Sequence, residues 1–156
     1  MQSQEQPELL SVPRRRGTYA LLLQLKPGKE IVVGRLGTFF FPEGYYAYVG
    51  SAFGPGGLAA RVARHCRHQK KLFWHIDYVL ADAQVLDLFY DLSGQPLECV
   101  WAGALQHMPG ARIIAPGFGA SDCRCSSHLV FLGNERSPHW GHLCHILATM
   151  SAGVSE

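Results

Sequence analysis

Apolar residues form short runs in the first third of the chain, and these runs predict β-strands. Residues 18–25 are almost continuously apolar and end at a Lys-Pro-Gly turn, as expected for a buried strand. β-Branched and aromatic residues dominate the segments 31–33, 38–41 and 44–50, and these residue types favour strands. We therefore expect a small antiparallel sheet in this part of the chain.

A glycine-rich loop and a basic helix follow these strands. Residues 50–57 include several glycines and a proline, which suits backbone angles that other residues avoid. Spacings of three and four residues place Leu58, Val62 and Cys66 on one helix face, which we expect to pack on the sheet. The outward face is predicted to carry the basic residues Arg61, Arg64, His65 and His68.

The remaining pattern predicts further strands and a second helix. Residues 73–80 and 85–92 are two apolar segments that read as the strands of a hairpin. Alternation in the first of them would place His75 and Asp77 on one strand face, where the pair is either a structural network or part of the chemistry. An apolar helical stretch runs from about residue 98 to 105, and residues 126–132 read as a last strand.

The order of these elements predicts an α+β domain with a small, mainly antiparallel sheet flanked by helices. The 156 residues are enough for one domain with a real core, which we place at residues 16–133. Residues 1–15 are polar and proline-punctuated and read as a disordered leader. Residues 134–156 read as a C-terminal tail that contains a short helix.

Composition and charge narrow the setting. No apolar run approaches the length of a membrane span, so we expect no membrane association. Five cysteines at irregular spacing, with no secretion signal, suggest reduced thiols and a cytoplasmic protein. The formal net charge of +2 is modest, so local clusters of arginine are the better indication of a nucleic-acid partner.

Two tripeptides and several later blocks carry a resemblance to a known family. The tripeptides are Gly17-Thr18-Tyr19 and Tyr48-Val49-Gly50. The later blocks are Arg61 with His65, residues 73–78, Glu98-Cys99 and residues 117–129. Together they resemble the GIY-YIG nuclease superfamily. Over roughly residues 16–133 the chain is most similar to a GIY-YIG-like subgroup of unassigned function, found alone or attached to endonuclease III-type repair enzymes.

The resemblance implies a divalent-metal-dependent endonuclease or nickase that hydrolyses phosphodiester bonds in DNA, in repair or a related process. It implies that Tyr19 lies near the attacking water, directly or through Tyr48, and that Arg61 stabilises the transferring phosphate. It also implies that Glu98 holds one Mg²⁺ or Mn²⁺ ion. Taken without the resemblance, the two tyrosines are equally well ordinary sheet aromatics, and Glu98 complements a helix dipole.

Several polar residues near these positions are candidates for contacts with substrate. His65 lies one turn after Arg61 and is expected to reach the same phosphate or to act as general acid. We expect nucleic-acid contacts from Arg16, Arg64, His75 and Arg124. The arginine triplet that includes Arg16 reads equally well as a solvated tail.

Two thiols and an imidazole lie close together in the segment Cys123, Cys125 and His128. Such groups bind zinc, but a standard site has two residues between paired cysteines and a fourth ligand. Cys66 or Cys99 supplies that ligand only if the fold brings one of them close. The spacing therefore favours a tight turn over a structural zinc site. Two other functions remain open, namely a nucleic-acid-binding module without turnover and a zinc-stabilised interaction protein.

Overall fold

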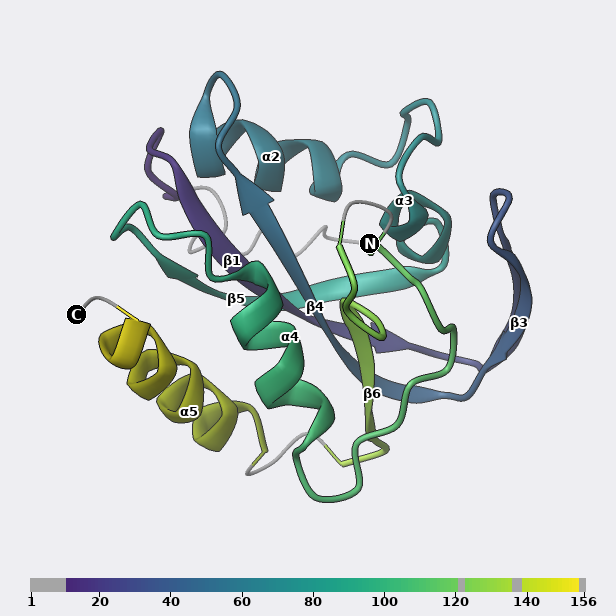
Figure 1. Ribbon diagram of the computed structural model, residues 1–156. Coiled ribbons are helices and arrows are strands. Elements are labelled where there is room, and N and C mark those ends of the chain that lie inside the picture. The colour runs from purple at the N-terminus through teal and green to yellow at the C-terminus, as the bar shows by residue number, and fades with distance from the viewer. Residues whose placement is uncertain (1–10, 121–122, 136–138, 155–156) are drawn as a thin grey trace.

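The computed structural model of the protein describes residues 11–120, 123–135 and 139–154. For residue 139 and residues 151–154 it describes the backbone only. Its main sheet has four antiparallel strands in the order β5-β1-β4-β6 (Figure 1). The strands span Gly17–Leu25 (β1), Gly44–Ala52 (β4), Ala83–Asp91 (β5) and Leu129–Gly133 (β6). A separate hairpin joins β2 (Lys29–Val33) to β3 (Gly37–Phe41). The predicted α+β class is confirmed.

Helices cover both faces of the main sheet. Helices α2 (Gly57–Cys66) and α3 (His75–Leu80) pack on one face, in the core that contains Tyr19, Leu21 and Tyr48. Helices α4 (Glu98–Gln106) and α5 (His139–Val154) cover the other face, in the core that contains Ala20, Ala47 and Trp101. Because β1 is buried on both faces, its sequence is apolar throughout rather than alternating. None of the helices in the described part of the chain is long and apolar enough to cross a membrane.

The prediction that residues 73–80 form the first strand of a hairpin is wrong, because residues 75–80 form helix α3. Ile76, Val79 and Leu80 are buried at the spacing of a helix face. The carboxylate of Asp77 accepts hydrogen bonds from the backbone N–H groups of Phe73 (2.9 Å) and Trp74 (2.8 Å) and so satisfies donors at the helix start. The predicted sharing of a strand face by His75 and Asp77 therefore does not occur.

The predicted orientation of helix α2 needs one correction. Leu58 and Val62 are buried as expected, but the next buried side chain along the helix is His65, which is only 3% exposed, while Cys66 is exposed. At about 100° per residue, His65 lies about 20° from Leu58 around the helix axis, whereas Cys66 lies about 80° away. His65 therefore faces the sheet and the core instead of the outward basic surface.

Segments outside the predicted domain contribute to the packing. Residues 1–10 of the predicted leader lie outside the described residues, but Val12 is buried, and the carbonyls of Pro13 and Arg15 accept hydrogen bonds from Ala59 and Leu58 at the start of α2. At the other end, α5 packs against α4 and β5, with Leu143 and Leu147 fully buried. Residues 136–138 of the predicted linker lie outside the described residues.

Candidate functional site

The two tripeptides lie side by side on neighbouring strands, β1 and β4. Their antiparallel register pairs Tyr19 with Gly50. A Cβ atom on Gly50 would lie 2.5 Å from Cζ of Tyr19, so only glycine leaves room for this ring. The ring centroids of Tyr19 and Tyr48 are 6.4 Å apart on the same face of the sheet. The pairing of the motifs thus has a direct packing reason.

Tyr19 and His65 form a buried hydrogen-bonded pair. The hydroxyl of Tyr19 lies 2.5 Å from Nε2 of His65, and Tyr19 is fully buried. Burial, with Lys70 and Arg61 nearby, lowers the pKa of His65 to about 3. Burial also raises the pKa of Tyr19 well above its ordinary value. At neutral pH the tyrosine O–H therefore donates to an uncharged imidazole, which has no extra proton to supply as a general acid.

Tyr48 lies nearer the surface than Tyr19 and between two charges. It is 8% exposed, and its pKa is raised by burial and by the carboxylate of Glu98, while the guanidinium of Arg61 acts in the opposite direction. The same two charges act on Tyr19. The four residues that the sequence nominated for phosphodiester chemistry therefore lie within electrostatic reach of one another.

Arginines from helix α2 stack on one tryptophan. The guanidinium carbons of Arg61 and Arg64 lie 4.3 Å and 4.0 Å from the ring centre of Trp74, at cation–π distance. Arg64 also makes a two-pronged ion pair with the fully buried Asp77, at 2.7 Å and 2.8 Å. Among the described residues, no carboxylate forms an ion pair with Arg61. Arg61 interacts with the hydroxyl of Tyr19, but its charge has no carboxylate partner and can be used by a ligand, whereas Arg64 is largely committed to the fold.

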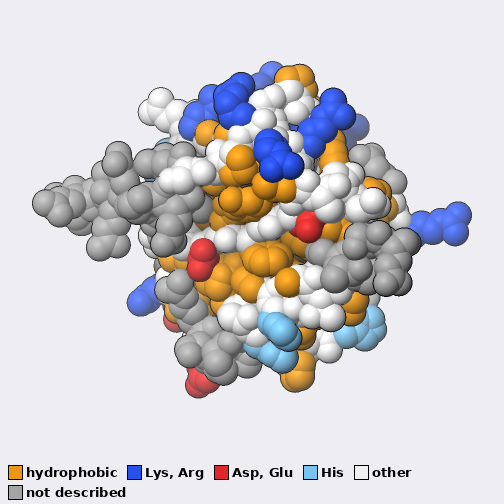
Figure 2. Space-filling view, turned by 90° about the vertical axis from the view of Figure 1, so that its left-hand side faces the viewer, with side chains coloured by type: hydrophobic (Ala, Val, Ile, Leu, Met, Phe, Trp, Pro, Cys, Tyr) orange, Lys and Arg blue, Asp and Glu red, His pale blue; other side chains and the backbone are white. Residues whose placement is uncertain are grey.

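The same arginines line a hollow along helix α2. Its walls include Arg61, Arg64 and Arg67, together with Gly54 and Pro55 of the glycine-rich loop. Figure 2 shows Lys and Arg side chains gathered at the end of the molecule where α2 lies, with few acidic groups beside them. A cationic hollow next to exposed backbone is suited to an anionic group such as a phosphate.

Glu98 is the first residue of α4 and lies beside the two tyrosine strands. The N–H of Leu97, just before it, donates to Oγ1 of Thr18 (3.3 Å), so the middle residue of the first tripeptide fixes where α4 begins. Oε1 of Glu98 lies 2.7 Å from Nδ1 of His128. Burial raises the pKa of Glu98, but hydrogen bonds from His128 and Ser51 outweigh it and lower the pKa overall. Its carboxylate is therefore ionised at neutral pH.

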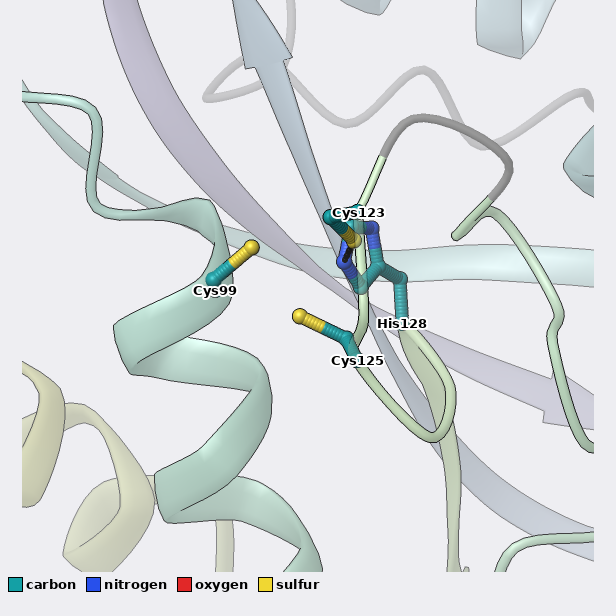
Figure 3. A group of neighbouring side chains, drawn as sticks. All are labelled: Cys99, Cys123, Cys125 and His128. Carbon is teal, nitrogen blue, oxygen red and sulfur yellow. Dashed lines mark hydrogen bonds between the residues drawn. The ribbon is translucent and has the colours of Figure 1, made fainter.

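A second group of polar side chains lies near Glu98 and includes its neighbour His128. Figure 3 shows the side chains of Cys99, Cys123, Cys125 and His128 converging from α4 and from the segment before β6. Their ligand atoms all lie within 4.8 Å of one another, an arrangement that can bind a metal ion. The fold therefore brings Cys99 to the place of the fourth potential ligand that the local cysteine spacing lacked. Cys66 is exposed on α2 and is not part of this group.

The other predicted nucleic-acid contacts are dispersed. Arg16 is exposed just before β1, and the ring nitrogen Nδ1 of His75 accepts a hydrogen bond from the N–H of Gly119 (2.8 Å). Arg124 lines a separate hollow together with Cys99 and Cys125. Arg64 lines the arginine hollow itself. Arg64 and Arg124 therefore line two different hollows.

Comparison with family models gives one match. The model described as Domain of unknown function DUF123 matches residues 18–149. The chain belongs to this DUF123 family. No curated protein and no solved structure matches the chain.

The DUF123 match includes both regions of polar side chains described above. It begins at Thr18, beside Tyr19, and runs through Glu98 and His128. It also extends past Gly133 into helix α5, whose residues Leu143 and Leu147 complete the core on the α4 face. Sequence reasoning gave no role to Thr18 or Ser51 and did not connect His128 with Glu98. These contacts form because α4 begins close to Thr18 in β1, to Ser51 in β4 and to His128 before β6.

Proposed function

We propose that this protein is a divalent-metal-dependent endonuclease or nickase of the GIY-YIG type, which hydrolyses phosphodiester bonds in DNA. The observation that supports this best is that the charges of Arg61 and Glu98 both act on the phenol of Tyr48. Tyr48 is a potential acid–base group and Glu98 a potential metal ligand, while Arg61 is a cation without an ion-pair partner among the described residues. Phosphodiester hydrolysis needs a positioned water, a cation at the non-bridging oxygens and help for the leaving oxygen.

Each residue has a definite part in this proposal. Arg61 binds the phosphate in the arginine hollow through two N–H donors, while Trp74 holds its guanidinium plane. Glu98 provides an ionised, partly exposed carboxylate, with 27% of its side chain exposed, which fits a hard cation. Mg²⁺ or Mn²⁺ held there would neutralise charge on the phosphate and make bound water more acidic. Tyr48 is the phenol close enough to the surface to contact the attacking water.

Tyr19 has an indirect part, because it is fully buried and donates a hydrogen bond to His65. We regard both as positioning residues. Their hydrogen bond ties β1 to helix α2, which carries Arg61, and the rings of both lie next to Tyr48. A substitution of Tyr19 or His65 would therefore shift the side chains of Arg61 and Tyr48 without removing a group that contacts the substrate.

A second candidate is a nucleic-acid-binding module without turnover. Two observations favour it, namely the complete burial of the Tyr19–His65 pair and the contact of Glu98 with His128. A carboxylate that is already engaged by an imidazole has less capacity for a catalytic cation. The arginine hollow would serve binding alone equally well.

A cleavage assay separates these two candidates. Labelled single-stranded, duplex, nicked and branched DNA, with RNA counterparts, would be incubated with Mg²⁺ or Mn²⁺ and the wild-type protein. Glu98→Gln and Tyr48→Phe are expected to reduce cleavage at least about a hundredfold, whereas Glu43→Gln, on the exposed turn between β3 and β4, should leave it unchanged. If the wild type and all variants bind nucleic acid without cleaving it, the second candidate is favoured. If the wild type shows no binding and no cleavage, both candidates are contradicted.

A further inference from the structure

We propose that Cys99, Cys123, Cys125 and His128 bind one structural Zn²⁺ ion, which ties the segment 123–128 to the start of helix α4. The proposal does not depend on the nuclease activity. It rests on the convergence of four ligand atoms, on the partner of the histidine and on the backbone that holds this segment.

The distances are close to those of a tetrahedral zinc site. Zinc binds sulfur at about 2.3 Å and imidazole nitrogen at about 2.0–2.1 Å, which places sulfur about 3.5 Å from nitrogen and sulfurs about 3.8 Å apart. Sγ of Cys123 lies 3.4 Å from Nε2 of His128, and no two of the four ligand atoms are more than 4.8 Å apart. Shifts of about 1 Å in the ligand atoms would close the tetrahedron.

His128 has the surroundings of a metal-binding histidine. Its ring is 2% exposed, and its two nitrogens face different groups. Nδ1 lies 2.7 Å from the carboxylate of Glu98, and Nε2 points toward Cys123. In the present ring orientation Nδ1 makes no hydrogen bond of good geometry. A small rotation of the ring would direct an Nδ1 proton at Glu98 and leave the lone pair of Nε2 free for an ion. Carboxylates that fix the tautomer of a ligating histidine in this way are a general feature of zinc sites.

The backbone around the ligands is held by hydrogen bonds of its own. The N–H of His128 donates to the carbonyl of Phe118 (2.8 Å), and its carbonyl accepts from Val49 (2.9 Å) in strand β4. The hydroxyl of the buried Ser127 donates to the carbonyl of Leu129 and accepts from its N–H. The segment from 126 to 129 is thus anchored, so the ordering cost of gathering the ligands is partly met before an ion arrives.

The set of ligands favours zinc and a structural role. Three thiols and an imidazole are soft to intermediate donors, which select Zn²⁺ over Mg²⁺ or Ca²⁺. Four protein ligands fill a tetrahedral shell and leave no position for water, so the ion would not itself activate a nucleophile. The alternative of a disulfide between Cys123 and Cys125 is disfavoured, because a single intervening residue does not allow normal geometry.

The first test is the metal content of protein purified without chelators. Elemental analysis is expected to find close to one zinc per chain in the wild type. Cys99→Ser and Cys125→Ser should lose most of it, whereas Cys66→Ser and Cys144→Ser, outside the cluster, should retain it. If a cluster variant does not fold, titration of wild-type thiols with an organomercurial should release zinc in step with thiol modification.

A second readout concerns the ligand geometry and the partner of His128. Cobalt added to the metal-free protein should give the absorption of a tetrahedral, thiolate-bound ion. Glu98→Gln should weaken zinc binding about 10- to 100-fold, measured by competition with a chromogenic chelator, even if the protein has no nuclease activity. Wild-type protein that contains no zinc, gives no thiolate–cobalt absorption and has all five thiols free or oxidised would overturn the proposal.

Discussion

The two polar regions that meet at Glu98 differ in what holds them together. The tyrosine–arginine region, made of Tyr19, Tyr48, Arg61, Arg64, His65, Trp74 and Asp77, is closed by the protein's own groups: Tyr19 bonds to His65, and Asp77 pairs with Arg64. The cysteine cluster, made of Cys99, Cys123, Cys125 and His128, brings together four potential metal ligands, of which His128 alone contacts a charged group, Glu98, among the described residues. The first region is held by contacts within the protein, and the second has an arrangement that can bind a metal ion.

This difference explains how one glutamate serves both regions. The carboxylate of Glu98 touches His128 of the cysteine cluster and acts electrostatically on Tyr48 of the tyrosine–arginine region. An ion in the cluster would fix the ring of His128 and, through it, one oxygen of Glu98. Structural metal binding would in this way position a group of the proposed active site.

The largest effect is expected from removing the ion pair between Arg64 and Asp77, which holds the tyrosine–arginine region together. Asp77→Ala should lower the free energy of unfolding by about 3 kcal/mol, because it leaves Arg64 and two N–H groups without their buried partner. Asp82→Ala, which removes an exposed pair with Lys29, should cost about 0.5 kcal/mol or less. Equal losses in urea denaturation would break the comparison.

The packing of Tyr19 gives the next effect. Gly50→Ala should destabilise the protein by about 2–3 kcal/mol, because the new methyl group would overlap the ring of Tyr19. Gly103→Ala, in helix α4 with no atom near the added methyl, is the matched control and should stabilise by about 0.5–1 kcal/mol. Thermal or urea unfolding of both variants measures the difference. A neutral Gly50→Ala would mean that the tyrosine pocket is loose.

The buried histidine predicts a pH dependence. The pKa of His65 is about 3 in the folded state and near its ordinary value when unfolded, so below about pH 6.5 the unfolded state binds more protons. Stability should therefore fall as the pH falls, with His65 accounting for about 2 kcal/mol between about pH 7.5 and about pH 5. His65→Gln should remove that part. Urea denaturation of the wild type and of His65→Gln at the two pH values, in metal-free buffer, measures this difference. The same pH dependence of stability in both proteins would show that His65 is not buried.

Hydrogen exchange compares the two regions directly and has the smallest expected effect. Removal of metal should speed exchange at the amide of His128 at least about tenfold, because the bonds around the cysteine cluster would open more often. Amides in the middle of β1, such as that of Leu21, should be unaffected. Equal acceleration in both places would show that the ion supports the whole domain rather than the segment 123–128.

Much of the sheet could be predicted from the sequence, because its strands are apolar and end at glycine or proline. The placement of the two tyrosines on neighbouring strands was predicted and is confirmed, whereas the register that sets Tyr19 opposite Gly50 is known only from the structure. Helix α3 was mistaken for a strand because six residues are too few to separate a period of 2 from one of 3.6. The signal that was available is Asp77, which accepts hydrogen bonds from the residues before the helix.

The candidate site was harder to predict, because its contacts join distant segments. His65 faces inward by a rotation of only tens of degrees, which a helical face assignment does not resolve. The cysteine cluster depends on where helix α4 docks, and local spacing around Cys123 gives no information about Cys99. The contact of Glu98 with His128 depends on the same docking. Residue types indicated the chemistry, and tertiary packing determined which residues share it.

The most direct test of the proposed function is the cleavage of labelled DNA by Arg61→Ala, compared with the wild type at equal zinc content. Arg61 contacts the hollow and has no ion-pair partner among the described residues, so its loss should remove phosphate stabilisation while the fold and the cysteine cluster persist. We predict a loss of about 100- to 1,000-fold in cleavage rate, with Arg35→Ala, on the β2–β3 turn, unchanged. Cleavage by Arg61→Ala at the wild-type rate would contradict the account.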